Sequence, residues 1–298
     1  MDEFLSATIR GLAQGSLYTL LGLGFVIIYK GTRVVNFAQP VLMIFGAYFT
    51  SYFVLALDLP FALGVLAAVL TTAAIAAVSE RVALRPMVGE QPFSAAMVTV
   101  GVLIALQVIA NDLLGLELRQ MGDPWGLSRE VLGGVAIFHR DIAALLITAS
   151  VVAGMAVFFK LSRIGLALRA AAFDQEAALA QGVPVGRMFG ISWAISGGLA
   201  ALAGLLVGTG GAGVDQNTTF IALKALPAII LGGLDSIPGA VVGGLAIGMA
   251  ETYTKVYQPE HFAWAGANFD QVVPYLVMLL VLLVRPYGLF GTKEVERV

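Results

Sequence analysis

The chain lacks cysteine and has few histidines and few charged residues. Of its 298 residues none is cysteine, two are histidine and 12% are charged. The missing thiols exclude disulfide bonds and thiolate metal sites. His139 and His261 lie far apart in polar stretches, so no metal site is predicted. A soluble globular protein carries charge on roughly a quarter of its residues, and this composition excludes that class.

Motifs for common chemistries are also missing. The pattern Gly-x-x-x-x-Gly-Lys-Ser/Thr does not occur, so the chain does not bind ATP by a P-loop. No Ser/His/Asp set or paired-carboxylate site stands out, and we expect neither enzymatic activity nor a cofactor. The formal net charge of −2 does not suggest a nucleic-acid partner. Two acids precede the first base, which is not typical of a cleavable signal peptide.

The chain is rich in long apolar segments, and 59% of its residues are hydrophobic. About 20 consecutive apolar residues span a bilayer as a helix. The runs lack the alternation of barrel strands, which predicts an all-α polytopic membrane protein. We expect a single transmembrane domain over 1–298 with about 8–9 transmembrane or re-entrant helices. The apolar segments are Leu12–Tyr29, Phe37–Leu57, Phe61–Val78, Ser94–Leu114, Ile142–Phe159, Phe189–Gly208, Phe220–Leu234, Ile237–Tyr253 and Val272–Val284.

The two segments around residue 235 are short and separated by Gly232–Gly239. They form either a tight hairpin of spans or a pair of re-entrant half-helices, and periodicity does not decide between these. Glycines four residues apart are dense in this part of the chain and favour close helix packing. The pairs are Gly204 and Gly208, Gly239 and Gly243, and Gly244 and Gly248.

Basic residues in short loops predict the orientation, because cytoplasmic loops are enriched in lysine and arginine. Four basic groups are separated by even numbers of apolar segments, which allows all of them to be cytoplasmic. The polar loop Gly115–Asp141 would lie outside, with the N-terminus outside and the C-terminus inside. The four groups are Lys30 and Arg33; Arg81 and Arg85; Lys160, Arg163, Arg169 and Arg187; and Arg285, Lys293 and Arg297.

A short capped helix is predicted within the most polar of these loops. Asp174 is a good N-cap and Gly182 suits the position after the last turn. Such a helix could seat in a groove of a partner, or it could simply join two spans. The residues that we assign to a coupling helix are Arg169, Asp174, Gln175, Glu176, Ala177, Ala178 and Gly182.

Several motifs, in order along the whole chain, resemble the permease subunits of branched-chain amino acid ABC importers, the H-type more than the longer M-type. They are Gly15–Tyr18, Gly22–Gly24, Val35–Ala38, Glu80–Pro86, Arg169–Asp174, Lys224–Leu226, Leu231–Ala240, Pro286–Gly291 and Glu294–Val298. One departure is Gln39-Pro40-Val41, where the family usually has His-Gly and an acid. Asp235 stands where the family commonly has a small residue.

The resemblance implies a bacterial inner-membrane protein with three kinds of partner. These are a second related permease, two cytoplasmic ABC ATPases and a periplasmic substrate-binding protein. It also favours docking of the helix after Asp174 onto an ATPase. Branched-chain or other hydrophobic amino acids are the expected substrates. Urea, amides, or aromatic and other organic acids remain open alternatives, as do a secondary transporter and a channel.

Two further predictions concern polar residues in apolar surroundings. Because Asn36 and Gln39 interrupt an apolar stretch, we expect Val35–Pro40 to be an irregular or re-entrant element that lines the translocation route; the alternative is a loop at the cytoplasmic boundary. An antiparallel turn near residue 235 would bring Lys224 and Glu251 to similar heights, which predicts an ion pair or a shared polar network; the alternative is that each charge extends separately to the outer interface. The candidate pathway residues are Asn36, Phe37, Gln39, Ser236 and Pro238.

Overall fold

The computed structural model describes residues 2–87, 90–115 and 118–292, so Lys293, Arg297 and the motif Glu294–Val298 lie outside the described residues. Within these ranges six helices are long and apolar enough to cross a bilayer. Shorter apolar helices and a 25-residue helix near the C-terminus accompany them. The prediction of an all-α polytopic membrane protein is confirmed. The six candidate spans are Asp2–Thr32, Gln39–Ala56, Phe61–Met87, Phe93–Leu114, His139–Leu161 and Val185–Gly208.

The elements follow one another with short connections. The first four helices are α1 (Asp2–Thr32), α2 (Gln39–Ser51), α3 (Phe61–Ser79) and α4 (Pro92–Leu114). A hairpin of β1 (Arg129–Leu132) and β2 (Val135–Phe138) precedes α5 (His139–Leu161), α6 (Arg163–Phe173), α7 (Gln175–Ala180) and α8 (Val185–Gly208). The last helices are α9 (Thr219–Leu223), α10 (Ala225–Gly232), α11 (Ile237–His261) and α12 (Val273–Val284). π-helical turns follow α2 at Tyr52–Ala56 and α3 at Glu80–Leu84, and 3-10 turns lie at Arg85–Met87, Gln216–Thr218, Ala263–Ala265 and Phe269–Gln271.

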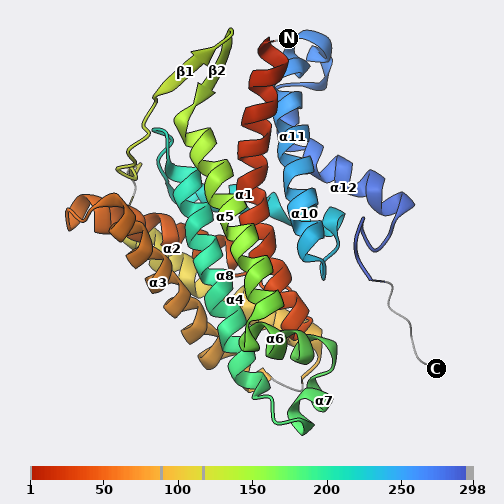
Figure 1. Cartoon of the computed structure of the whole chain (residues 1–298). Helices are drawn as coiled ribbons and strands as arrows, with labels where there is room; N and C mark the ends of the chain where they lie inside the picture. The colour runs from red at the N-terminus through yellow and green to blue at the C-terminus, as the bar shows by residue number, and fades with distance from the viewer. Residues whose placement is uncertain (1, 88–89, 116–117, 293–298) are drawn as a thin grey trace.

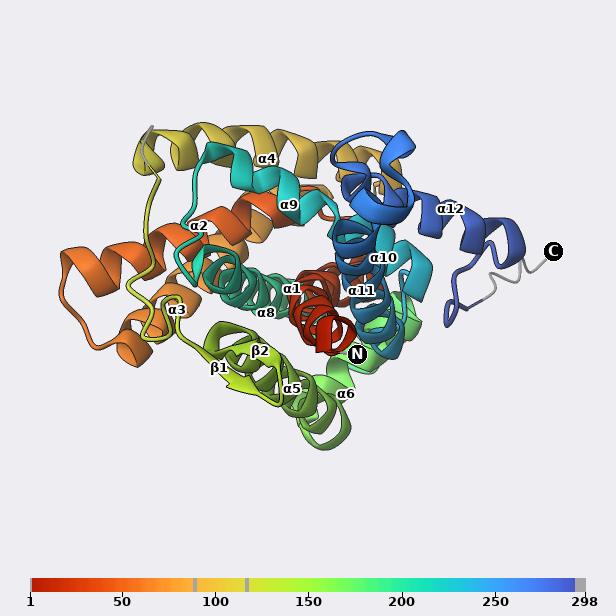
Figure 2. The ribbon, with the colours of Figure 1, turned by 90° about the horizontal axis from the view of Figure 1, so that it is seen from above.

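Helix α1 is the centre of the molecule. It packs against α11, α8, α5 and α10, and Figure 2 shows these helices around it. Its middle is buried on all sides, including Leu20, Leu21 and Leu23. A helix that is hydrophobic all round is typical of a segment that is buried among other helices or in lipid.

The molecule has two opposite faces, which lie at the top and the bottom of Figure 1. The N-terminal end of α1 lies with the β hairpin at one end, here called the hairpin face. Helix α7 lies at the other end, here called the α7 face. Lys30 donates to the Asp235 carbonyl oxygen at 3.3 Å and Arg85 to the Gly186 carbonyl oxygen at 2.6 Å. These contacts gather the basic segments that follow α1 and α3 on the α7 face, near the start of α8.

The helices that face outward carry apolar side chains. Leu70 of α3, Ile104 of α4, Leu146 of α5 and Leu283 of α12 are 61–83% exposed. In water such a surface would be an aggregation liability, whereas lipid is a suitable solvent for it. The outward faces of α3, α4, α5 and α12 therefore fit a bilayer.

Small residues allow α11 to pack tightly between α1 and α10. A Cβ atom on Gly248 would lie 2.2 Å from the backbone nitrogen of Gly15 on α1. A Cβ atom on Gly243 would lie 2.1 Å from the carbonyl oxygen of Ala228 on α10. One on Gly204 of α8 would meet an α2 carbonyl oxygen at 2.1 Å. The prediction that these glycines form packing seams is confirmed.

Substitution of Gly248 by alanine is expected to destabilise the protein by about 1–3 kcal/mol, because the methyl group overlaps the α1 backbone. Gly154→Ala in α5 is the matched control, since no atom lies within 4 Å of its added Cβ. Thermal unfolding in lipid nanodiscs should show a lower midpoint for the first variant only. Equal midpoints would contradict the tight seam.

The segments around residue 235 form an antiparallel hairpin with unequal arms. Helix α10 packs along α11, and the turn between them contains Gly233 at φ 107°. The first arm, Thr219–Gly232, is roughly 21 Å long, whereas the 25-residue α11 is about 37 Å long. The open choice between two spans and two half-helices is thus resolved as one full-length helix and one short partner.

The β hairpin was not anticipated within the loop Gly115–Asp141. Leu132 pairs with Val135, so Gly133 and Gly134 form the two-residue turn. Both glycines have positive φ, 58° and 90°, as a hairpin turn of this length requires. The Gly-Gly pair between apolar residues was the available signal.

Candidate functional site: the coupling helix, the α7-face cavity and the buried polar network

Helix α7 is capped at both ends. The Asp174 carboxylate accepts a hydrogen bond from the Ala177 backbone N–H at 2.9 Å. At the other end Gly182 adopts φ 81°, and the Val183 N–H donates to the Ala178 carbonyl oxygen at 2.9 Å. This is a Schellman closure. The predicted capped helix is confirmed.

The two faces of α7 differ. Ala178 is 5% exposed and packs in a cluster with Met188 and Phe189 of α8. Ala177 is exposed, and Phe173, just before the cap, is 94% exposed. Ala178 therefore anchors the helix to its own chain, and the side with Ala177 is free for another molecule.

A side chain of α7 also reaches the end of α1. The Gln175 amide nitrogen donates to the Gly31 carbonyl oxygen at 3.2 Å. Glu176 is exposed in the first turn of α7, and Arg169 is exposed on α6. Apart from the buried Ala178, the predicted coupling residues thus lie at or near the surface of the α7 face, with Gln175 as the link to the central helix.

Replacement of Asp174 by alanine is expected to weaken α7 by about 1 kcal/mol, because the Ala177 N–H loses its acceptor. Hydrogen exchange of the 175–180 amides should accelerate accordingly. Asp174→Asn is the control, since asparagine caps a helix about as well. Equal exchange in the alanine variant and the wild type would show that the cap does not hold this helix.

The segment 33–38 between α1 and α2 is irregular, which confirms the prediction for 35–38, whereas Gln39 and Pro40 already belong to the first turn of α2. Asn36 is fully buried, and its Oδ1 accepts from the Ala38 N–H at 3.0 Å. The Phe37 N–H donates to the Thr99 hydroxyl of α4 at 3.0 Å, so a side chain replaces the missing helical partner. Asn36 does not face lipid. Its place on the translocation route stays a prediction.

Gln39 joins three helices. Its Oε1 accepts from the Ser196 hydroxyl of α8 at 2.6 Å, and its amide nitrogen donates to the Ser196 carbonyl oxygen at 3.2 Å. A Cβ atom on Gly24 of α1 would lie 2.2 Å from that nitrogen, so glycine makes room for it. Pro40 sits in the first turn of α2, where a missing N–H is tolerated. Gln39 and Pro40 therefore fit this fold as packing residues.

Ser236 and Pro238 lie in the turn that begins α11. The Ser236 hydroxyl accepts from the Gly239 N–H at 3.0 Å as an N-cap, and Pro238 is exposed in the first turn. Asp235 accepts from the Thr292 N–H at 3.3 Å and from its hydroxyl. The carboxylate that departs from the family pattern thus fastens the C-terminal segment. A role of Ser236 and Pro238 in the route stays a prediction.

The predicted pair of Lys224 and Glu251 is confirmed. The Lys224 ammonium nitrogen lies 2.5 Å from Glu251 Oε1. The other carboxylate oxygen accepts from the Tyr18 hydroxyl of α1 at 2.5 Å, and Gln14 donates to that hydroxyl at 3.0 Å. Both oxygens of a buried carboxylate are therefore satisfied, as a charge at this depth requires.

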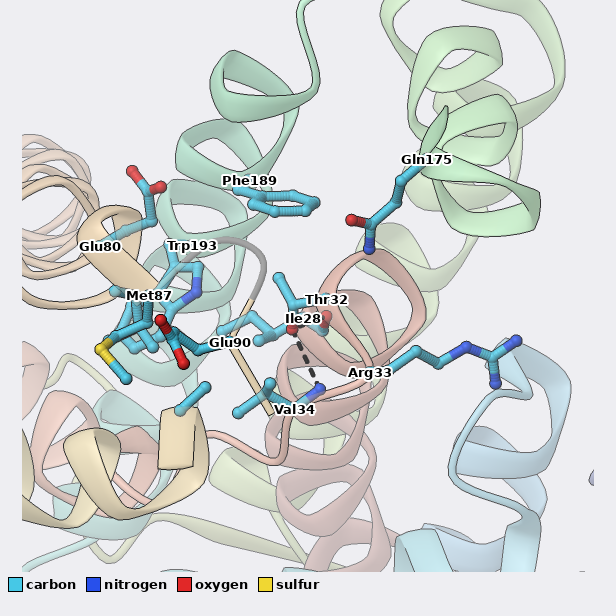
Figure 3. Close-up of a pocket in the computed structure, with 12 residues that line it drawn as sticks. Ile28, Thr32, Arg33, Val34, Glu80, Met87, Glu90, Gln175, Phe189 and Trp193 are labelled. Carbon is cyan, nitrogen blue, oxygen red and sulfur yellow. Dashed lines mark hydrogen bonds between the residues drawn. The ribbon is translucent and has the colours of Figure 1, made fainter. Parts of the chain in front are cut away.

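A cavity of about 290 Å³ opens on the α7 face (Figure 3). Glu80 and Glu90 line one part of it, and Gln175 of α7 lines another. Figure 3 shows Gln175 above the end of α1, at the side of the cavity away from Glu90. Helix α7 therefore forms part of the wall of a space that also borders α1 and the end of α3.

Sequence reasoning did not find the ion pair at this cavity. Arg85 Nη2 lies 3.2 Å from Glu80 Oε2, and Glu80 is 1% exposed. The π-helical turn Glu80–Leu84 brings residues five apart together, and the Arg85 N–H donates to the Glu80 carbonyl oxygen. An acid and a base five apart in Glu80–Pro86 were visible, but a regular α-helix would not have paired them.

The comparisons with known proteins agree with this architecture. The family model described as "Branched-chain amino acid transport system / permease component" matches residues 7–282. The permease protein BraD of a high-affinity branched-chain amino acid transport system, from Pseudomonas aeruginosa, is 30% identical, with 99% of this chain and 98% of that protein covered. LivH of Salmonella typhimurium is also 30% identical, with the same shares covered. A probable branched-chain amino acid permease LivH of Methanocaldococcus jannaschii is 26% identical over 96% of this chain and 93% of that one.

A polytopic helical bundle with a capped helix on one face is the architecture of a membrane permease subunit. The chain belongs to the family of permease components of branched-chain amino acid transport systems. It is a membrane protein and a permease component of such a system.

Proposed function

We propose that this chain forms half of the translocation pathway of an ATP-driven importer for branched-chain or other hydrophobic amino acids. Residues 1–298 act as one transmembrane domain in the bacterial inner membrane. The second half is a related permease, two ABC ATPases supply the work, and a periplasmic binding protein delivers the substrate. Val35–Pro40, Ser236 and Pro238 border the route.

The single observation that carries the proposal is helix α7. It is capped at both ends, exposed along the side of Ala177, and tied to α1 by the Gln175–Gly31 hydrogen bond of 3.2 Å. In an ATP-driven transporter, a permease without a P-loop must receive its motion from another chain, and a stiff exposed helix suits that purpose. The α7 face is then cytoplasmic, which agrees with its basic residues, and the N-terminus is outside.

The test is reconstitution. The permease pair and its ATPases are placed in proteoliposomes, with the binding protein and radiolabelled leucine on the hairpin-face side and ATP on the other. Uptake that requires ATP and stops without the binding protein supports the proposal. Uptake driven by a proton or sodium gradient without ATP would identify a secondary transporter, and gradient-independent flux of leucine would identify a channel.

A further inference from the structure

A second, larger cavity of about 600 Å³ opens towards the hairpin face. Six elements of this one chain line it: α1, β2, α5, α8, α9 and α11. Its volume lies in the range of small-molecule sites. A single subunit therefore provides these lining residues.

The cavity carries charges of both signs. Three bases, Arg10, Arg140 and Lys255, and two acids, Asp141 and Glu251, line it. Glu251 has no free oxygen, because Lys224 and Tyr18 bind one each. The charge available to a ligand comes from the other four residues.

Asp141 is the unsatisfied acid. It is 6% exposed, and its Oδ2 has no hydrogen-bond partner although it is buried. Its Oδ1 lies 3.5 Å from Arg140 Nε, which is too long for a strong charge-assisted bond. A buried carboxylate without a strong donor is costly, and an ammonium group in the cavity against the Asp141 side chain would lower that cost.

Two of the three bases lie near one aromatic ring. The Arg10 and Arg140 guanidinium carbons lie 5.1 and 5.7 Å from the centroid of the Phe138 ring. Neither Arg10 nor Lys255 is in any of the four ion pairs of the described residues. Guanidinium groups match carboxylates in geometry, so this side of the cavity suits an anionic group.

Much of the remaining lining is aliphatic, and Gln14, Thr209 and Thr252 add uncharged polar groups. Between the charged groups, small and branched side chains leave room for an apolar substituent. These residues are Ala13, Leu17, Ala144, Leu206, Val207 and Ile221.

We propose that this cavity is a binding site for a zwitterionic aliphatic α-amino acid, with its ammonium group at Asp141 and its carboxylate at Arg10, Arg140 and Lys255. The proposal rests on the proposed function and deepens it, because it places a substrate site within one permease subunit rather than only between two. The site should therefore select a zwitterion. A ligand with only one of the two charges would leave either Asp141 or the three bases without an opposite charge.

The first test measures binding without transport. Thermal unfolding of the full-length permease in nanodiscs is followed with leucine, with isovalerate (no ammonium group) and with 3-methylbutylamine (no carboxylate). Leucine alone should raise the midpoint, saturably. Asp141→Asn and Leu206→Trp, which fills the cavity without touching a charge, should abolish the shift. Glu260→Gln, at an exposed acid near the end of α11, should retain it. A shift of equal size with either analogue, or in the Asp141→Asn variant, would overturn the proposal.

The second test measures ATP-driven uptake by the reconstituted transporter. Asp141→Asn should raise the KM for leucine at least tenfold while association with the ATPases is unchanged. Normal wild-type uptake, together with an unchanged KM in this variant and no leucine shift in nanodiscs, would reject the site and leave the proposed function standing. A leucine-specific shift without any ATP-driven uptake would reject the proposed function and leave the site standing.

Discussion

Lys224→Met is expected to destabilise the protein by about 3–5 kcal/mol, the largest effect of any single substitution considered. Among the described residues, the change removes the one cation in an ion pair with Glu251, whose side chain is 9% exposed. The carboxylate would remain buried with only the Tyr18 hydroxyl as donor. An unpaired buried ion costs far more than an exposed one. Thermal unfolding of the purified permease in nanodiscs measures the loss.

Two further variants separate charge from shape. The double variant Lys224→Met, Glu251→Gln should recover much of the lost stability, because it removes both charges. Lys160→Met, at an exposed lysine near the end of α5, should change the midpoint little. A double variant no more stable than Lys224→Met alone would mean that the ion pair is not the source of the effect.

Ala177→Asp is expected to reduce ATP-coupled uptake and ATPase association by 100-fold or more. In the proposed assembly the exposed side of α7 sits in an ATPase groove, where a new carboxylate would be buried without a partner. A penalty of about 3–5 kcal/mol corresponds to at least two powers of ten in affinity. Aspartate in the first turn suits the helix dipole, so the helix itself should persist.

The neighbouring alanine is not an equivalent test. Ala178 is 5% exposed against α8, so Ala178→Asp is expected to disturb the fold and lower the unfolding midpoint. Ala263→Asp, at an exposed alanine on the hairpin face, is the control for an added charge and should leave uptake normal. Normal uptake and normal ATPase binding by the Ala177→Asp variant would show that α7 only connects α6 to α8.

Apolar runs predicted the spans but not the ends of the helices. Leu12–Tyr29 became α1, Asp2–Thr32, because the polar first turns continue the helix beyond the apolar run. Likewise Ile237–Tyr253 extends to His261 in α11. Hydropathy records which part of a helix lies in apolar surroundings, whether these are lipid or other helices. Hydrogen bonding and packing against neighbouring elements decide where the helix stops.

The signals that were read correctly act over a few residues, whereas several of the missed contacts join residues far apart in the sequence. The cap at Asp174 and the glycine at 182 are readable from their neighbours. Gln39 meets Ser196 from 157 positions away, and no local pattern announces that contact. The pair of Lys224 and Glu251 was predictable because the turn near residue 235 places both residues at similar distances along its two arms. Tyr18, which also binds Glu251, is 233 positions away from it and was not predictable.

Helix α1 connects the two faces of the molecule. Helix α1 is about 46 Å long, is touched by Gln175 near one end, and lines the larger cavity with Arg10 and Gln14 near the other. About three quarters of the way along α1, the Ser196 hydroxyl donates to the Gly24 carbonyl oxygen at 3.0 Å, and the Gln39 amide packs against Gly24. An unbroken helix of this length moves as one stiff element. We expect a displacement at the α7 end to reach the larger cavity through the helix itself, without a relay of side chains.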